Sequence, residues 1–393
     1  MLKIKKIIFV FCALCFMFSS FVSAGNAEEY SEYNCENEQY AEYYQEQLNA
    51  SGADQLMSAL DDETINLLEQ LGINEIDFEH LLNISPQSLL DLFLKIITGK
   101  MQNPLKMFAS VLSVIILCAM MECFKVSFSE KSLGGLFSLV STVLIGLIIV
   151  IPMMECISHV CSAITLSSNF MLIFVPVITV LLAASGKPVT ASGLNLIIFT
   201  AAELISRFSS SLLIPLLCIY LAFSIVGVLS PDINLSGLSD IIKKSVNFIL
   251  GFFSTVFVSM VSLQGILGQS ADTVATRTTK FLLGNFVPVV GGAIGDTITT
   301  VQSCVGLTKN TVGAFGLIAA VLIYIPVIAE LIVWILCVQA CSAAAALFGL
   351  KTAGDLLKAI YYTLSLLLSI LLFCAVLLII STGIMVMLGG NGN

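Results

Sequence analysis

Charged residues are scarce in this sequence of 393 residues, since Asp, Glu, Lys and Arg together make up 11% of it. Soluble domains carry about 25% charged and about 45–50% apolar residues, whereas this chain is 58% hydrophobic with a mean hydropathy of +1.00. A single soluble globular fold is therefore excluded. The high apolar content also excludes a disordered chain, and the net charge of −9 excludes a nucleic-acid binder.

Catalytic motifs are also missing. The sequence has two histidines, His80 and His159, but no His-Glu-x-x-His motif and no Gly-rich phosphate loop ending in Lys-Ser/Thr. The Cys-x-x-Cys pair Cys12 and Cys15 lies in a segment that we expect to be removed. An ATPase or a metalloprotease is therefore disfavoured, and we expect a non-enzymatic protein without metal or cofactor.

The first 24 residues have the form of a secretory signal peptide. A short basic start precedes an apolar run from Ile7 to Phe18, and small residues follow up to Ala24. We expect cleavage after Ala24, with Ala27 as the alternative site. An uncleaved anchor is the other interpretation, but the run is short for a bilayer span of about 20 residues.

Residues 25–104 form an acidic head that the signal places outside the cytoplasm. Between Gly25 and Lys100 there are 16 Asp and Glu against two Lys, which gives a charge of −14. Helical spacing of leucines appears from Asp54 onward, with a helix stop at Gly72 and a new helix beginning at Pro86. We therefore predict a small helical region that carries most of the negative charge.

The body, residues 105–393, divides into apolar runs long enough to cross about 30 Å of hydrocarbon. We predict eight spans at about 105–123, 134–154, 163–184, 192–209, 211–229, 246–267, 312–336 and 360–388. Residues 281–300 form another apolar piece, but it is rich in Gly and Pro, so we interpret it as re-entrant or broken. The predicted fold is an all-α, polytopic membrane protein.

The positive-inside rule supports this topology over most of the chain. With the head outside and eight spans, four lysine-bearing loops fall on the cytoplasmic side and the C-terminus falls outside. These loops carry Lys125 with Lys131, Lys187, Lys243 with Lys244, and Lys351 with Lys358. Arg277 and Lys280 fall outside and do not fit the rule.

Ionisable residues within the apolar runs are the first candidates for a functional site, because a charge in hydrocarbon is costly. Glu203 and Arg207 are four residues apart on one predicted helix, so they share a face and can neutralise each other. Glu330 has no cation within a turn of its own helix. For all three residues, a structural role and a place in a transport pathway both stay open.

The most distinctive stretch lies between Ala275 and Gly316. It contains Arg277-Thr278-Thr279-Lys280-Phe281, Gly284-Asn285-Phe286-Val287-Pro288-Val289-Val290-Gly291, Asp296 and Lys309-Asn310-Thr311-Val312-Gly313. With these motifs, behind a signal peptide and an exported head, the sequence closely resembles the stage III sporulation protein AE family. We expect the stretch to form either a re-entrant element at the mouth of a pathway or a rigid packing corner. Its candidate residues are Arg277, Lys280, Asn285, Pro288, Asp296 and Lys309.

The resemblance implies a membrane subunit of the sporulation channel complex that links mother cell and forespore. The implied partners are the ring-forming subunits and secretion-type ATPase of the stage III sporulation A complex, the forespore partner protein and the lipid bilayer, with no nucleic acid. The implied location is the mother-cell membrane around the forespore, with the head in the intermembrane space. The alternative is a stand-alone secondary transporter of a small solute or ion that uses Glu203, Arg207 or Glu330.

Overall fold

A computed structural model of the chain describes residues 46–76, 81, 86–128, 133–229, 236–286 and 291–388. Only the backbone is described at 122–128, 133–138, 264–286 and 291–304 and at a few single positions. The expected signal peptide and its cleavage site lie outside the described residues.

The described part is helical and contains no strand, which confirms the all-α fold class. Among the described residues of the head, positions 46–51 are helical, and the helices α3 (Gln55–Ser58), α4 (Asp62–Gln70) and α6 (Pro86–Lys100) follow. The body consists of α7 (Gln102–Phe128), α8 (Leu133–Ala184), α9 (Pro188–Phe208), the π-helix η1 (Ser209–Leu213), α10 (Ile214–Leu229), α11 (Ser236–Phe286), α12 (Gly291–Leu347) and α13 (Lys351–Leu388).

Local signals begin and end the helices of the head, and two of these signals were predicted from the sequence. The side chain of Asp61 accepts a hydrogen bond from the Thr64 backbone N–H at 3.1 Å, which caps the start of α4. Gly72 has a φ of +81°, and the backbone N–H of Ile73 donates to the carbonyl of Leu68 at 2.9 Å. This left-handed glycine ends the helix, so the stop predicted at Gly72 is confirmed. The helix predicted to begin at Pro86 is also present.

The first difference from the predicted spans lies in α8. We expected spans 134–154 and 163–184 to be separated by a loop, but the chain is helical over all 52 residues from Leu133 to Ala184. The helix continues because polar residues between the two runs, including His159, lie on its exposed side, whereas Cys156 and Val160 are buried on the other side. A continuous helix does not reverse direction, so these two predicted spans are one helix.

The second difference lies between α9 and α10. We expected spans 192–209 and 211–229 to be separate, but α9, η1 and α10 follow one another without a turn. The serine-rich break is absorbed as a π-helical segment, Ser209–Leu213, in which the side chain of Ser209 is buried. Six helices in the described part are therefore long and apolar enough to cross a membrane, where the sequence suggested eight spans. How many of them cross remains a prediction.

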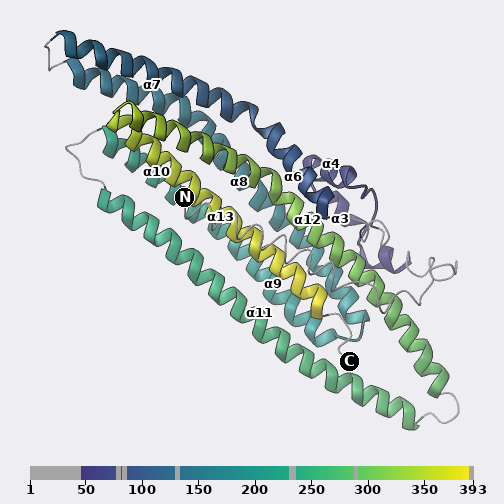
Figure 1. The fold of residues 1–393 in the computed structure, drawn as a ribbon. Helices are drawn as coiled ribbons and strands as arrows, with labels where there is room; N and C mark the ends of the chain where they lie inside the picture. The colour runs from purple at the N-terminus through teal and green to yellow at the C-terminus, as the bar shows by residue number, and fades with distance from the viewer. Residues whose placement is uncertain are drawn as a thin grey trace.

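The long helices lie side by side in an up-and-down arrangement, with the head helices against one side of the bundle (Figure 1). α8 and α12 are antiparallel, because His159 contacts Glu330 and Phe174 lies beside Gly316. The C-terminal end of α8 therefore lies near the N-terminal half of α12, on the same end of the bundle as the head. Lys187 follows α8 directly and lies at this end, whereas Lys243 and Lys351 lie near the starts of helices at the opposite end. The side of the membrane that each end faces stays a prediction.

The centre of the bundle is formed by α12 and α13. From Val305 to Val338 almost every residue of α12 is buried or half-buried. Two glycines of α12 allow its neighbours to approach closely: a Cβ added at Gly313 would overlap the side chain of Val386 in α13, and one added at Gly316 would overlap the ring of Phe174 in α8. Small residues at such crossings are typical of packed membrane helices.

Residues 281–300 do not form an element of their own. Residues 281–286 are the last turns of α11, and residues 291–300 are the first turns of α12. Residues 287–290 between them lie outside the described residues. α11 therefore ends just before residues 287–290, and α12 begins just after them. The re-entrant form of residues 281–300 stays a prediction.

Candidate functional site

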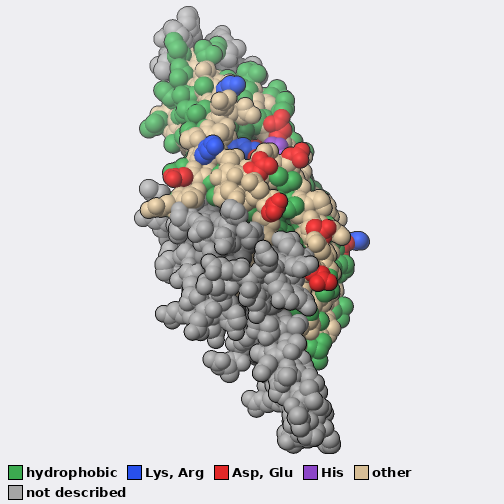
Figure 2. Space-filling view, turned by 90° about the vertical axis from the view of Figure 1, so that its right-hand side faces the viewer, with side chains coloured by type: hydrophobic (Ala, Val, Ile, Leu, Met, Phe, Trp, Pro, Cys, Tyr) green, Lys and Arg blue, Asp and Glu red, His purple; other side chains and the backbone are tan. Residues whose placement is uncertain are grey.

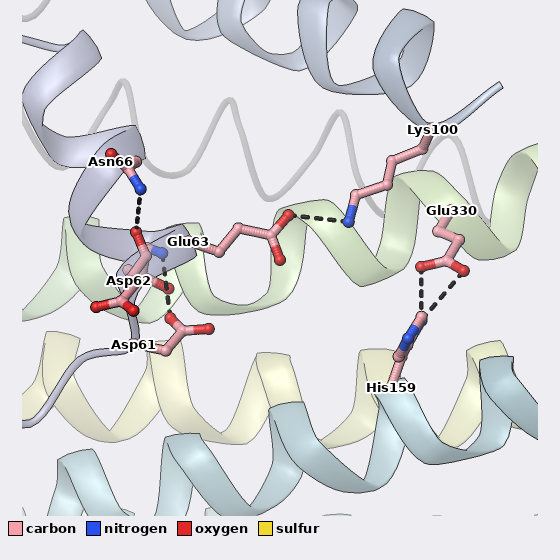
Figure 3. A network of polar contacts seen from close by, with 8 residues as sticks. Asp61, Asp62, Glu63, Asn66, Lys100, His159 and Glu330 are labelled. Carbon is pink, nitrogen blue, oxygen red and sulfur yellow. Dashed lines mark hydrogen bonds and ion pairs between the residues drawn. The ribbon is translucent and has the colours of Figure 1, made fainter. Parts of the chain in front are cut away.

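A polar contact between α8 and α12 lies within two otherwise apolar helices. The Nδ1 atom of His159 lies 3.1 and 3.0 Å from the two carboxylate oxygens of Glu330. Figure 3 shows the imidazole directed at the carboxylate across the gap between the helices. The Glu330 side chain is 13% exposed and the His159 side chain is 51% exposed. In the tautomer that carries its hydrogen on Nδ1, the imidazole donates to the carboxylate oxygens of Glu330, which accept.

The sequence did not identify this partner of Glu330. We expected His159 in a short loop outside the spans, but it lies in the middle of α8. The two residues are 171 positions apart, and only the antiparallel packing of α8 against α12 brings them together. The spacing of His159 from Glu155 and Ser162, four and three residues away, was a signal that this stretch is helical. It carried no information on the contact with Glu330.

Glu203 and Arg207 form the second polar pair, within α9. The Arg207 Nε–H donates to Glu203 Oε1, so the pairing expected from their spacing is present. The Arg207 side chain is 79% exposed and that of Glu203 is 36% exposed. The two charges neutralise each other on the outer surface of the bundle, and neither residue contacts the His159–Glu330 pair through a described hydrogen bond or ion pair.

A small, mainly apolar cavity that is partly open lies between the helices of the bundle. Its volume is about 30 Å³, and residues of α8, α9, α11, α12 and α13 line it. The hydroxyl-bearing residues of the lining are Ser167, Ser168, Ser206, Tyr324 and Ser381. The Tyr324 hydroxyl donates to Ser167 Oγ at 2.7 Å and so connects α12 with α8. A volume of this size holds one or two water molecules and has no room for a larger solute.

Lys309 is the most buried of the candidate residues. Its exposed fraction is 1%, and it lies in α12 beside Thr308, whose hydroxyl donates to Gln47 Oε1 of the head at 3.4 Å. The distinctive Lys309-Asn310-Thr311-Val312-Gly313 motif is thus at the junction of the head and the bundle, where Gly313 allows close contact with α13. This placement fits a packing role for the motif.

The other candidate residues cannot be compared at side-chain level. Arg277, Lys280 and Asn285 belong to α11 and Asp296 belongs to α12, but their side chains are outside the described part. Pro288 lies among residues 287–290, also outside it. Within the part of the chain that the structure describes, no group of three or more His, Cys, Asp and Glu side chains could hold a metal ion.

The described geometry defines a polytopic α-helical membrane protein, in which polar groups connect apolar helices and a small acidic head packs against one side. The sequence model of the stage III sporulation protein AE family matches residues 75–389, and the chain belongs to that family. Membership implies a role in sporulation.

A curated relative supports the same assignment. The stage III sporulation protein AE of Bacillus subtilis (strain 168) is 26% identical over 235 residues, which is 60% of this chain. The matched part spans 59% of the relative's own length. No solved structure matches the chain.

Proposed function

We propose that this chain is a non-enzymatic membrane subunit of the channel complex that links mother cell and forespore during sporulation. The observation that carries the proposal is the extent of the family match, residues 75–389, which includes both the end of the head and the whole helical bundle. The proposed location is the mother-cell membrane around the forespore, with the head in the intermembrane space.

The head has the form of a docking platform fixed to the bundle. Lys100 Nζ of α6 pairs with Glu63 Oε1 of α4 at 2.9 Å (Figure 3), and the contact of Gln47 with Thr308 joins the head to α12. The side chains of Asp62, Glu69 and Glu75 are exposed. An acidic surface of this kind supports contact with basic surfaces of other subunits, by complementary charge.

The lysines support the proposed orientation. Lys243 and Lys244 are in the first turns of α11, and Lys351 and Lys358 are in the first turns of α13. Both helix starts lie at the end of the bundle opposite to the head (Figure 1). This end is therefore proposed to face the cytoplasm of the mother cell, in agreement with the positive-inside rule.

A stand-alone transporter is the competing function, and the interior of the bundle gives it little support. A transporter of this kind holds its solute between helices near the membrane midplane. The cavity beside Tyr324 has room for one or two water molecules only. The proposed role is therefore that of a platform or part of a conduit built together with other subunits.

Purification from sporulating cells tests the proposal. We expect an affinity-tagged chain, solubilised in mild detergent, to retain ring-forming subunits and the secretion-type ATPase identified by mass spectrometry. A Glu69→Lys, Glu75→Lys variant should retain less of the ring-forming subunits, whereas a Lys351→Gln variant at the opposite end should retain the normal amount. If the purified chain carries no such subunit and instead catalyses solute uptake into liposomes alone, the proposed function is wrong.

A further inference from the structure

The helices α11 and α13 lose their charged residues at the same level. α11 has no charged residue between Lys244 and Asp272, and α13 has none after Lys358. Each charge-free stretch is longer than the about 20 residues that cross a bilayer. The two helices meet where these stretches begin, because Lys243 Nζ lies 4.3 Å from the centre of the Tyr362 ring. This level is therefore suited to the surface of the membrane.

Aromatic side chains mark the same level. Tyrosine is enriched at the interface between membrane and water, and Tyr362 is 39% exposed and in edge contact with the ring of Tyr361. Lys358 is four residues before Tyr362, so both side chains lie on one face of α13. The cations of two helices, Lys243 and Lys358, therefore converge on one tyrosine.

The charged residues around Tyr362 form what we call the α11–α13 basic cluster, which has a net charge of +2. They are Lys243, Lys244, Lys351, Lys358, Asp240 and Asp355. The chain as a whole carries −9, and acidic side chains gather across the middle of the face drawn in Figure 2. A positive cluster is thus a local feature of the ends of α11 and α13.

The lysines of the cluster keep donors for a further partner. Lys243 and Lys244 form no ion pair with any residue that the structure describes. Lys358 Nζ is 3.0 Å from Asp355 Oδ1, but both side chains are 60% exposed, and an exposed pair of this kind is weak. Each ammonium group has three N–H donors, so it can bind a phosphate oxygen as well.

An exposed apolar surface follows the cluster along α11. Phe248 and Phe252 are four and eight residues after Lys244, so the three side chains lie on one face of the helix. The two phenylalanines are 73% and 55% exposed, and their rings stack at 6.4 Å. α11 lies at the edge of the bundle (Figure 1), and 22% of its apolar window is buried, the smallest share among the six described helices of membrane length. This face is therefore open to lipid chains.

A phospholipid with a net negative charge has the same order of groups. Its phosphate lies at the membrane surface and its acyl chains lie below, and Phe252 is about 12 Å below Lys244 at 1.5 Å per residue. Basic residues of neighbouring membrane helices bind anionic headgroups of this kind. The charge of the cluster favours such a lipid over phosphatidylcholine, whose choline group is itself positive.

We propose that α11 and α13 form a binding site for an anionic phospholipid, with the headgroup at Lys243, Lys244 and Lys358 and the acyl chains along Phe248 and Phe252. The site is independent of the proposed channel role, because it needs only these two helices in a membrane. It also gives α11, the least buried of the long helices, a contact that fixes its start beside α13.

Native mass spectrometry of the full chain in mild detergent tests the site. Titration with phosphatidylglycerol should show about tenfold tighter binding than titration with phosphatidylcholine. Inorganic phosphate at the same concentration should not displace the bound phosphatidylglycerol, because the acyl chains contribute to binding. Displacement by phosphate, or equal affinities for the two lipids, would overturn the proposal.

Charge-removing variants locate the site. Lys243→Gln with Lys358→Gln should weaken phosphatidylglycerol binding about tenfold and leave phosphatidylcholine binding unchanged. Lys243→Arg with Lys358→Arg should bind within about twofold of the unchanged chain, since a guanidinium group also stacks on tyrosine and binds phosphate. The matched control, Lys95→Gln with Lys106→Gln, removes two exposed lysines of α6 and α7 and should bind normally. An equal loss in the control and in the Lys243, Lys358 variant would mean that only total charge matters and would overturn the site.

Discussion

The helices α8 and α12 have similar composition but different surroundings. The apolar part of α8 has a mean hydropathy of 2.3 and that of α12 a mean hydropathy of 2.7. The buried share of these stretches differs more, since it is 39% in α8 and 67% in α12. α12 is in contact with neighbours on nearly all sides, whereas α8 leaves one side uncovered along its length. The difference shows that apolar composition identifies a membrane helix, while the burial of that helix depends on how the other helices pack around it.

The largest effect is expected where α8 and α12 cross, at the buried contact of Gly316 with Phe174. Gly316→Ala adds a Cβ that overlaps the ring of Phe174, so we expect a loss of about 1–3 kcal/mol in the free energy of unfolding. Unfolding titrations with sodium dodecyl sulfate in mixed micelles measure the change.

Gly306→Ala is the matched control, since nothing lies within 4 Å of a Cβ at Gly306. We expect it to be neutral or slightly stabilising, because alanine favours helix more than glycine does. Phe174→Leu combined with Gly316→Ala should recover part of the loss. Equal effects of the two glycine variants would contradict the close approach of α8 and α12.

A second buried contact is expected to have a smaller effect. Tyr324→Phe removes the hydroxyl that donates to Ser167 Oγ at 2.7 Å, and we expect a loss of about 1 kcal/mol in the free energy of unfolding. Ser167→Ala should give a similar value, and the two changes together should cost less than their sum. Strict additivity in this double-mutant cycle would show that the hydrogen bond does not stabilise the bundle.

The sequence predicted the class of fold because hydropathy and helix signals are local. The all-α membrane fold, the stop at Gly72 and the helix start at Pro86 depend on neighbouring residues only, and the structure contains all three. The predicted loop between 134–154 and 163–184 was wrong for a physical reason. Polar residues at 155–165 look like a loop in a hydropathy average, but they occupy one side of a helix whose other side is buried.

The candidate site was predicted less completely than the fold. Glu203 and Arg207 were paired from their spacing, since both lie on one helix. The partner of Glu330 was missed, because the contact with His159 depends on how two distant helices pack. Hydropathy treats each helix alone, so it carries no information on such contacts.

The His159–Glu330 pair connects the buried helix with the exposed one and should have an intermediate effect. We expect His159→Ala to lower the free energy of unfolding by about 0.6 kcal/mol, and by no more than about 1.7 kcal/mol, the range for polar contacts between membrane helices. Glu330→Gln should cost less than His159→Ala, since the amide still accepts a hydrogen bond from Nδ1. A loss in the His159→Ala, Glu330→Ala double variant equal to the sum of the single losses would contradict a direct contact.

The smallest effect is expected at the exposed pair of α9. Arg207 is 79% exposed and bonds to Glu203 one turn earlier, so Arg207→Ala should change the free energy of unfolding by about 0.5 kcal/mol or less. Sporulation efficiency, counted as heat-resistant spores, should stay normal because the pair only neutralises charge on the surface. Normal protein levels together with a strong sporulation defect in Arg207→Ala would instead mean that this surface binds a partner or lines a pathway.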